Sequence, residues 1–248
     1  MTLPSFGPPT NWIEIPGAND RRDVENFLGR VCKMDESAAV RIVDTGGALR
    51  FWARTPFGPM GTRVVVGSAS APDQIVLAHA LAVAPDSEGR IDLGYLMPSA
   101  WQGMLPPPGG FVQIELVDAQ EILDLARRGR EVAADESGPL GVAPSLLDQD
   151  VISINPDLAG DSTTGDSTTG DSADAEEGAA DGSEEPAATA VKMHTIFALT
   201  GLGFVPARAG TAPAGEKVRV SVRGPWVRLD GRFGSVYHRP ESLPLDVL

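Results

Sequence analysis

The chain has 248 residues, of which 42% are hydrophobic, and its formal net charge is −14 at neutral pH. A single cysteine excludes a disulfide bond within the chain, and no stretch approaches the roughly 20 apolar residues of a membrane span. We therefore expect a soluble, cytoplasmic protein with apolar residues for one large core or two small ones.

The charge is distributed unevenly along the chain. Residues 155–190 contain ten acidic side chains and no lysine or arginine, whereas residues 192–239 contain eight basic side chains and two acidic ones. The acidic segment (residues 155–190) has Leu158 as its only large apolar residue. Such a segment cannot bury enough apolar surface to offset its ordering entropy, which predicts disorder. It separates an N-terminal region, residues 1–154, from a basic C-terminal region, residues 191–248.

The N-terminal region is expected to begin with a helix near Asn19. Its apolar residues recur at the spacing of one helical face, namely Val24, Phe27, Leu28 and Val31. Three strand-like stretches follow across turns that contain glycine or proline, at residues 39–44, 48–54 and 62–66. They predict an antiparallel meander with the helix packed on one face.

The middle of the chain is less regular. Residues 70–73 (SAPD) resemble a helix start, which favours a helix over residues 71–83, although the apolar run there fits a buried strand equally well. Residues 105–110 (LPPPGG) form a stiff connector. A strand is expected at 111–117, and Asp118 is then placed to cap a helix.

Short strand-like pieces flank the acidic segment, at residues 151–154 and 189–192. They suit a hairpin whose tip has been expanded, because loop-closure entropy grows only slowly with length. In that case the acidic segment is an insertion in one fold and its flanks touch. The alternative is a linker between two independent domains.

The C-terminal region is expected to begin with a helix over residues 193–202. Residues 217–223 (KVRVSVR) alternate between valine and polar side chains, which predicts a strand with one face on a core. Two more short strands, at 226–229 and 233–238, would complete a second small meander packed on the N-terminal region. The predicted fold is thus α+β, with small antiparallel meanders packed with helices and interrupted by a long disordered acidic insertion.

The polar side of the strand at 217–223 is the candidate binding surface. Its cations, with nearby arginines and interleaved aromatic residues, suit nucleic acid or an acidic partner. The candidate residues are Lys217, Arg219, Arg223, Trp226, Arg228, Arg232 and Tyr237. A solvated outer face, or an edge strand charged against aggregation, explains the same pattern.

Sequence signatures of catalysis are absent. The three histidines lie far apart and lack metal-ligand spacing: His79, His194 and His238. Cys32 follows an apolar stripe, which is typical of a small buried side chain. There is no nucleophile elbow and no phosphate-binding glycine loop. We expect no metal, no cofactor and no enzymatic activity.

The leading functional hypothesis is a non-catalytic intracellular binding, adaptor or regulatory protein with a protein partner. The acidic segment would act as a tether, or as an intramolecular mask of the basic C-terminal surface. The alternative is a nucleic-acid-binding protein that uses the basic strands. A second alternative is an enzyme without a recognisable motif. The oligomeric state is left open.

Three segments together resemble uncharacterised conserved proteins of high-GC Gram-positive bacteria. They are LPPPGGF at 105–111, HTIFALTGLGF at 194–204 and WVRLDGRFGSVYH at 226–238. The resemblance implies a C-terminal unit with a helix followed by strands, and it carries no catalytic motif and no function. Because the two sides of the acidic segment resemble one continuous unit, it also favours the insertion.

Overall fold

The computed structural model describes residues 10–81, 83–86, 89–136, 144–154 and 190–239. Its helices are α1 (Ala18–Met34), α2 (Ala119–Glu136), α3 (Pro144–Leu147) and α4 (Met193–Gly201), with 3-10 turns η1 (Ala78–Ala80) and η2 (Pro98–Ala100). Helices and antiparallel sheets are mixed along the chain, so the α+β class is confirmed.

The strands fall into one large sheet and two small ones. The large sheet contains β2 (Ala39–Asp44), β3 (Ala48–Arg54), β4 (Met60–Val66), β6 (Asp73–Leu77), β8 (Val112–Asp118), β11 (Lys217–Arg223), β12 (Trp226–Gly231) and β13 (Gly234–His238). One small sheet contains β1 (Trp12–Glu14), β5 (Ser68–Ala69) and β7 (Arg90–Asp92). The other pairs β9 (Asp150–Ser153) with β10 (Ala190–Lys192).

The two predicted meanders are halves of a single eight-stranded sheet, with the order β6-β2-β3-β4-β13-β12-β11-β8. The join is short, because β13 pairs with β4 only at Met60, Gly61 and Thr62. At the far end β8 pairs with β11, about 100 residues away in the sequence. The sheet is therefore assembled from distant parts of the chain.

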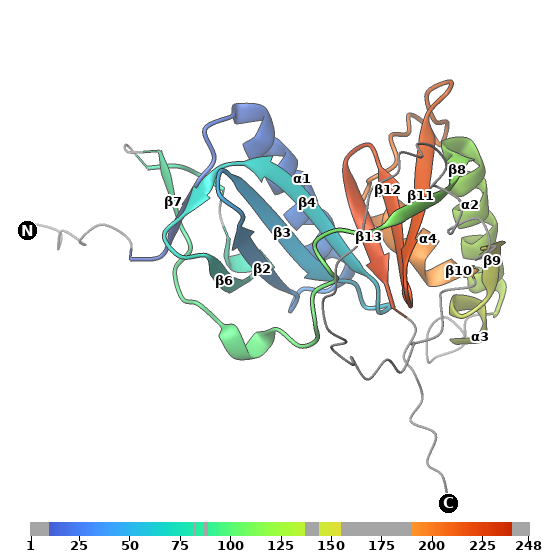
Figure 1. The fold of residues 1–248 in the computed structure, drawn as a ribbon, viewed down its shortest axis with the longest axis horizontal. Helices are drawn as coiled ribbons and strands as arrows, with labels where there is room; N and C mark the ends of the chain where they lie inside the picture. Colours follow the sequence, from blue (N-terminus) through green and yellow to red (C-terminus); the bar gives the residue numbers. More distant parts are fainter. Residues whose placement is uncertain (1–9, 82, 87–88, 137–143, 155–189, 240–248) are drawn as a thin grey trace, which may run out of the picture.

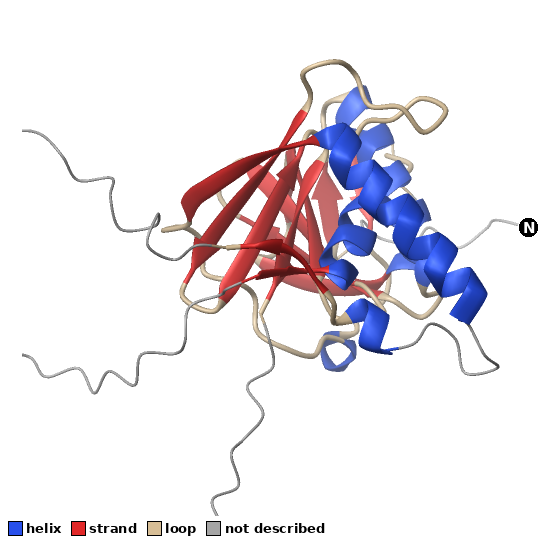
Figure 2. Cartoon of the chain, turned by 90° about the vertical axis from the view of Figure 1, so that its right-hand side faces the viewer, coloured by secondary structure: helices blue, strands red, loops and turns tan. Residues whose placement is uncertain are grey.

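One face of this sheet is covered by helices and the other is not. Figure 1 views the sheet with α1 and α4 behind it, and Figure 2, turned by 90°, shows the helices on one side of the strands. We call the uncovered side the helix-free face. The main apolar core lies between the sheet and the helices and runs through both halves of the sheet.

Helix α1 confirms its predicted stripe, because the four apolar residues of that stripe are its buried residues. Helix α2 begins after Asp118, whose Oδ1 accepts a hydrogen bond from the backbone N–H of Gln120 at 3.0 Å. Helix α4 confirms the helix predicted over residues 193–202, and it is buried on all sides over most of its length. All residues from Met193 to Leu199 are buried, because α4 lies between the sheet and α2.

The helix favoured over residues 71–83 is wrong. Residues Asp73–Leu77 form β6, which pairs antiparallel with β2, and only Ala78–Ala80 make a single 3-10 turn. Within β6, Gln74 and Val76 are buried, with the two-residue period of a strand. Pairing with the edge of β2 thus overrides the helix-start signal.

Strands β9 and β10 pair antiparallel, with Ser153 opposite Ala190. The chain therefore leaves β9 and returns to β10 at neighbouring points. The disorder predicted for residues 155–190 concerns a segment that lies, apart from Ala190, outside the described residues.

Candidate binding surface

The predicted binding residues lie on neighbouring strands and mostly share the helix-free face. Strand β11 supplies Lys217, Arg219 and Arg223, while Arg228 on β12 lies opposite Tyr237 on β13. The cross-strand partner of Arg223 is Trp226. Arg232 lies in the turn between β12 and β13 and bonds to Glu216, with 2.9 Å between Nε and Oε2.

Two of the predicted residues, Trp226 and Tyr237, are buried and not part of an open platform. They are 7% and 4% exposed, and pack with Trp52 and Met60 in an aromatic cluster separate from the main core. The rings of Trp52 and Tyr237 lie 5.2 Å apart. Burial raises the pKa of the Tyr237 hydroxyl above its usual value.

A length of the chain itself covers this aromatic cluster. We call residues 98–111 the connector; they include the stiff stretch predicted at 105–110. The connector runs from η2 to β8 across the helix-free face (Figure 1). Two arginines of the sheet hold it through its aromatic rings. Arg41 lies 5.9 Å from the ring centre of Trp101, and Arg228 lies 5.8 Å from that of Phe111. Both distances suit cation–π contacts.

Two more arginines hold the backbone of the connector. Arg54 donates a hydrogen bond from Nη1 to the carbonyl oxygen of Gln102 at 3.1 Å, and Arg223 donates to the carbonyl oxygen of Gly109. Neither bond neutralises a positive charge, because a carbonyl oxygen is not an anion. Four arginines of this face thus hold the connector in place.

Some cations of the helix-free face are neutralised by carboxylates on the same face. The ion pairs are Lys217–Asp118 at 3.2 Å, Arg228–Asp230 at 2.7 Å and Arg41–Asp73 at 2.5 Å. Four others make no ion pair within the described part of the chain, and we call them the open arginines. They are Arg50, Arg54, Arg219 and Arg223. They give the face a positive excess on a chain whose total charge is −14.

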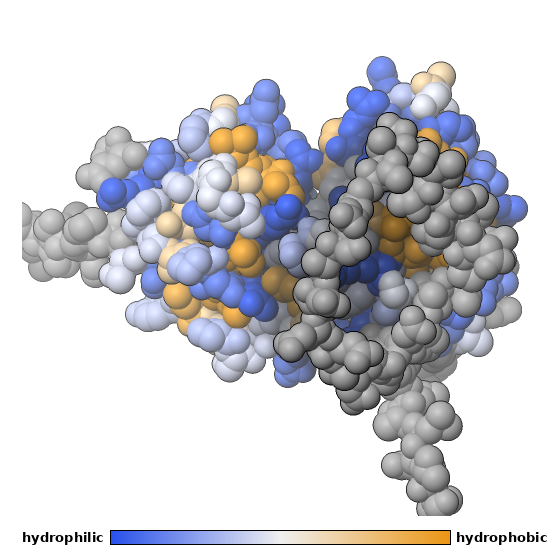
Figure 3. Space-filling model, viewed as in Figure 1, coloured by the Kyte–Doolittle hydropathy of each residue, from blue (hydrophilic) through white to orange (hydrophobic). Residues whose placement is uncertain are grey.

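Sequence reasoning missed Arg50 and Arg54, although the signal for them was present. They flank Trp52 at the two-residue spacing of one strand face on β3, just as Arg219 and Arg223 alternate with valines on β11. Only the continuous sheet brings the two strands to one face. On the helix-free face, hydrophobic side chains gather in separate patches among hydrophilic ones (Figure 3).

Sequence reasoning also missed a pair of histidines, of which His194 is buried and His238 is half-buried. The ring centres of His194, on α4, and His238, at the end of β13, lie 4.2 Å apart. Burial lowers the pKa of both, that of His238 to about 3, and Nδ1 of His194 is 3.7 Å from Asp148. Across the described residues, no group of three or more histidine, cysteine or acidic side chains is placed to hold a metal ion.

The described helices include none with the length and apolar character that a membrane crossing needs.

A search of curated proteins gave no match. Among solved structures, the fold is similar to Caulobacter crescentus pol III beta, with a TM-score of 0.51 and 17% identity over 95% of this chain and 66% of that one. A second structure, a DNA polymerase sliding clamp from Caulobacter crescentus, matches with a TM-score of 0.51 and 17% identity over 95% and 67%.

These similarities show the fold alone, and the chain spans about two thirds of the length of these two solved chains. Two family models divide the sequence between them. Residues 9–103 match a domain of unknown function, DUF8010, and residues 106–243 match another, DUF8185. The boundary falls within the connector. Because the second match spans more than half of the chain, the protein belongs to the DUF8185 family.

Proposed function

We propose that the protein is a non-catalytic binding protein whose helix-free face binds an acidic surface of a protein partner. The observation that carries this proposal is the set of four open arginines on one face of an acidic chain. A local positive field on a negative protein steers an acidic partner toward that face and orients it.

The fold supports the proposal by analogy only. One solved structure with this fold carries the name DNA polymerase sliding clamp, so its name links it to another protein, a polymerase. We extend that type of role, without its particular partner, to this chain. The positive face then takes the place of a catalytic site as the functional element.

The acidic segment acts in this proposal as a tethered competitor for the open arginines. Its two ends are fixed side by side at the β9–β10 pair. About 35 residues anchored at both ends reach roughly 50 Å outward, which is far enough to meet any face of a domain of this size. Tethering raises its effective concentration, so weak pairing competes with an outside partner and fades as salt rises.

Nucleic acid is the second candidate partner, because the same arginines suit phosphate groups. Base stacking on Trp226 and Tyr237 would require the connector to leave, since both side chains are buried beneath it. A nucleic acid would therefore be held by phosphate contacts alone, with a steep dependence on salt. The burial of these aromatic residues is the reason to place a protein partner first.

A same-length variant tests the proposal. All ten acids of the segment are replaced by asparagine or glutamine, and the native and neutralised proteins are titrated with fluorescent polyglutamate and with a single-stranded oligonucleotide. We expect the neutralised protein to bind polyglutamate about tenfold more tightly at low salt, with the difference lost at moderate salt. Preference for the oligonucleotide would favour the second candidate. Absence of binding to both probes would contradict the proposal.

A further inference from the structure

The join between the two halves of the sheet leaves part of β4 without a neighbour. Strand β13 accompanies β4 only as far as Thr62, because β13 begins at Gly234, directly after the turn that leads from β12. On the side away from β3, residues 63–66 have no partner strand among the described residues. In Figure 1 the two strands diverge toward the top of the view. The backbone groups of this free edge are therefore open to another strand.

Exposed apolar side chains accompany the free edge. Val64 is 43% exposed and Val66 is 63% exposed, both on β4, and Phe233 in the neighbouring turn is 40% exposed. An unpaired strand edge beside exposed apolar side chains is the arrangement that natural proteins otherwise protect. The chain leaves this one unprotected among its described residues.

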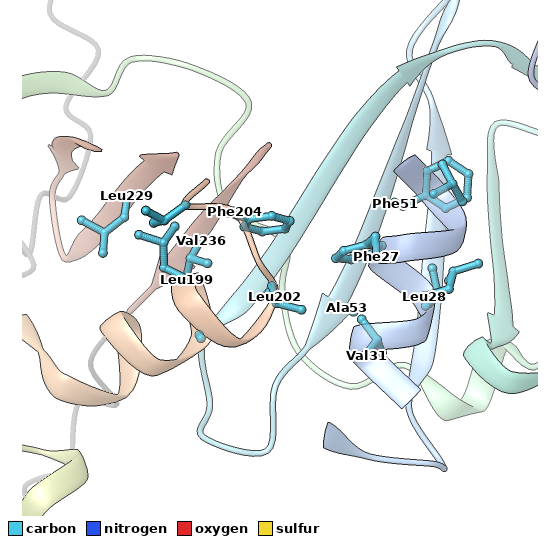
Figure 4. Packing of buried hydrophobic residues seen from close by; sticks show 14 of the residues in the cluster. Phe27, Leu28, Val31, Phe51, Ala53, Leu199, Leu202, Phe204, Leu229 and Val236 are labelled. Atoms are coloured by element: carbon cyan, nitrogen blue, oxygen red, sulfur yellow. The ribbon is translucent and has the colours of Figure 1, made fainter. Parts of the chain in front are cut away.

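A pocket of about 240 Å³ opens on the helix side of the same join. Its apolar wall comes from both halves of the molecule, with Phe27 of α1 and Phe204 stacked at 5.9 Å between ring centres, and with Phe233 at its rim. Figure 4 shows Phe27 and Phe204 pointing toward one another from the two sides of the join. We call this the seam pocket.

The polar wall of the seam pocket carries unequal charges. Arg63 pairs with Asp23 and also donates to the carbonyl oxygen of Phe233, so its charge is neutralised. Arg30 donates only to the carbonyl oxygen of Gly201, at 3.4 Å, and makes no ion pair within the described residues. Its charge remains available to a ligand. A carboxylate suits this pocket and an ammonium group does not.

We propose that the free edge of β4 and the seam pocket together bind an extended peptide segment of another protein. The peptide adds a strand of about four residues antiparallel to β4, in the position that β13 vacates. It places one apolar side chain in the pocket and a carboxylate beside Arg30. Main-chain hydrogen bonds supply affinity in this mode, and pockets for alternate side chains supply specificity.

The occupant follows from the chemistry of the site. The chain's own acidic segment has a single large apolar residue, Leu158, and does not match an edge flanked by valines and phenylalanines. A partner peptide that alternates apolar and polar residues matches both sides of the edge. This site is separate from the open arginines, so it stands or falls independently of the proposed function.

Fluorescein-labelled octapeptides test the inference on the full chain. They alternate threonine with valine, and on the threonine side they carry leucine, phenylalanine or methionine at the pocket position and aspartate two residues further on, because residues two apart share one face of a strand. Matched peptides replace the aspartate by lysine, or N-methylate alternate amides to block strand pairing. We expect the aspartate peptides to bind about tenfold more tightly than the lysine peptides, and the N-methylated peptides to lose binding.

Substitutions locate the site. Phe233→Ser and Val66→Lys are each expected to weaken binding about tenfold, and Arg30→Gln to abolish the preference for aspartate, which Arg30→Lys restores. Matched controls are Leu116→Ser, which removes a side chain 52% exposed on β8, and Arg128→Gln on α2. Equal binding of N-methylated peptides, equal effects of the controls, or no saturable binding up to about 1 mM would each overturn the inference.

Discussion

The two faces of the eight-stranded sheet are closed by different physical means. The helix side is sealed by apolar side chains from α1 and α4, in one core that runs through both halves of the molecule. The helix-free face is closed by the connector over a small aromatic cluster, and arginines hold that connector in place. Burial of apolar area stabilises the first face. On the second face, Arg54 and Arg223 donate hydrogen bonds to carbonyl oxygens, which leaves their positive charge uncompensated and available to a partner.

The largest expected effect comes from the helix side. Phe204 is 2% exposed and contacts both halves at the join, so Phe204→Ala should lower the free energy of unfolding by about 3–5 kcal/mol. Urea denaturation measures this loss. A loss below about 1 kcal/mol would mean that the two halves are not held together by one core.

The aromatic cluster should respond less to the same kind of truncation. Trp226→Ala removes a side chain that is 7% exposed, but the connector above it is a single irregular segment that can collapse into the space. We expect a loss of about 2–3 kcal/mol, together with faster amide hydrogen exchange in the connector. A loss equal to that of Phe204→Ala would remove the distinction between the faces.

The histidine pair predicts a dependence of stability on pH. The folded pKa of His238 is about 3, against about 6.5 for an unfolded histidine, because burial and the neighbouring His194 disfavour the charged ring. A lowered folded pKa stabilises the protein above the unfolded pKa, and that stability is lost as pH falls below about 6.5. Between pH 7 and 4.5 we expect a loss of about 2 kcal/mol.

A variant isolates this contribution from that of the carboxylates. Asp148 and Lys192 are the charged groups that act on the pair, and the Lys192 charge adds to the penalty for protonation. His238→Phe should flatten the dependence measured by urea denaturation, and His79→Gln, which replaces an exposed histidine, serves as the control variant. An unchanged slope in His238→Phe would contradict the assignment.

A smaller effect is expected for an arginine that holds the connector. Arg54→Met keeps much of the aliphatic stem and removes the hydrogen bond to the carbonyl oxygen of Gln102. The expected loss of stability is about 1 kcal/mol, with faster exchange in the connector. Arg128→Met on α2, an exposed residue, serves as the control. Unchanged exchange in the connector would show that Arg54 does not fix it.

Local periodicity predicted local structure well. The buried stripe of α1, the strands of the first meander and the alternation of β11 were all confirmed, because each reports its own contact with a core. The failures involve contacts between distant segments. Residues 71–83 begin with a helix-start signal, yet Asp73–Leu77 within them pair with β2 as an edge strand.

The candidate surface was predictable only in part for the same reason. The alternation in 217–223 correctly placed Lys217, Arg219 and Arg223 on one polar face. Nothing local indicated that the connector would bury Trp226 and Tyr237, or that β3 would bring Arg50 and Arg54 onto that face. The histidine pair joins residues 44 positions apart and was equally hidden.

The central claim is that the open arginines of the helix-free face are a binding surface, and one titration tests it most directly. The double variant Arg50→Ser with Arg219→Ser is compared with Arg22→Ser with Arg128→Ser, which removes the same charge from α1 and α2 on the opposite side. Both are made in the neutralised-segment protein and titrated with polyglutamate at low salt. The account predicts a loss of affinity of about tenfold or more for the first pair and little change for the second. Equal losses in the two would show that polyglutamate responds only to net charge, and the helix-free face would not be the binding surface.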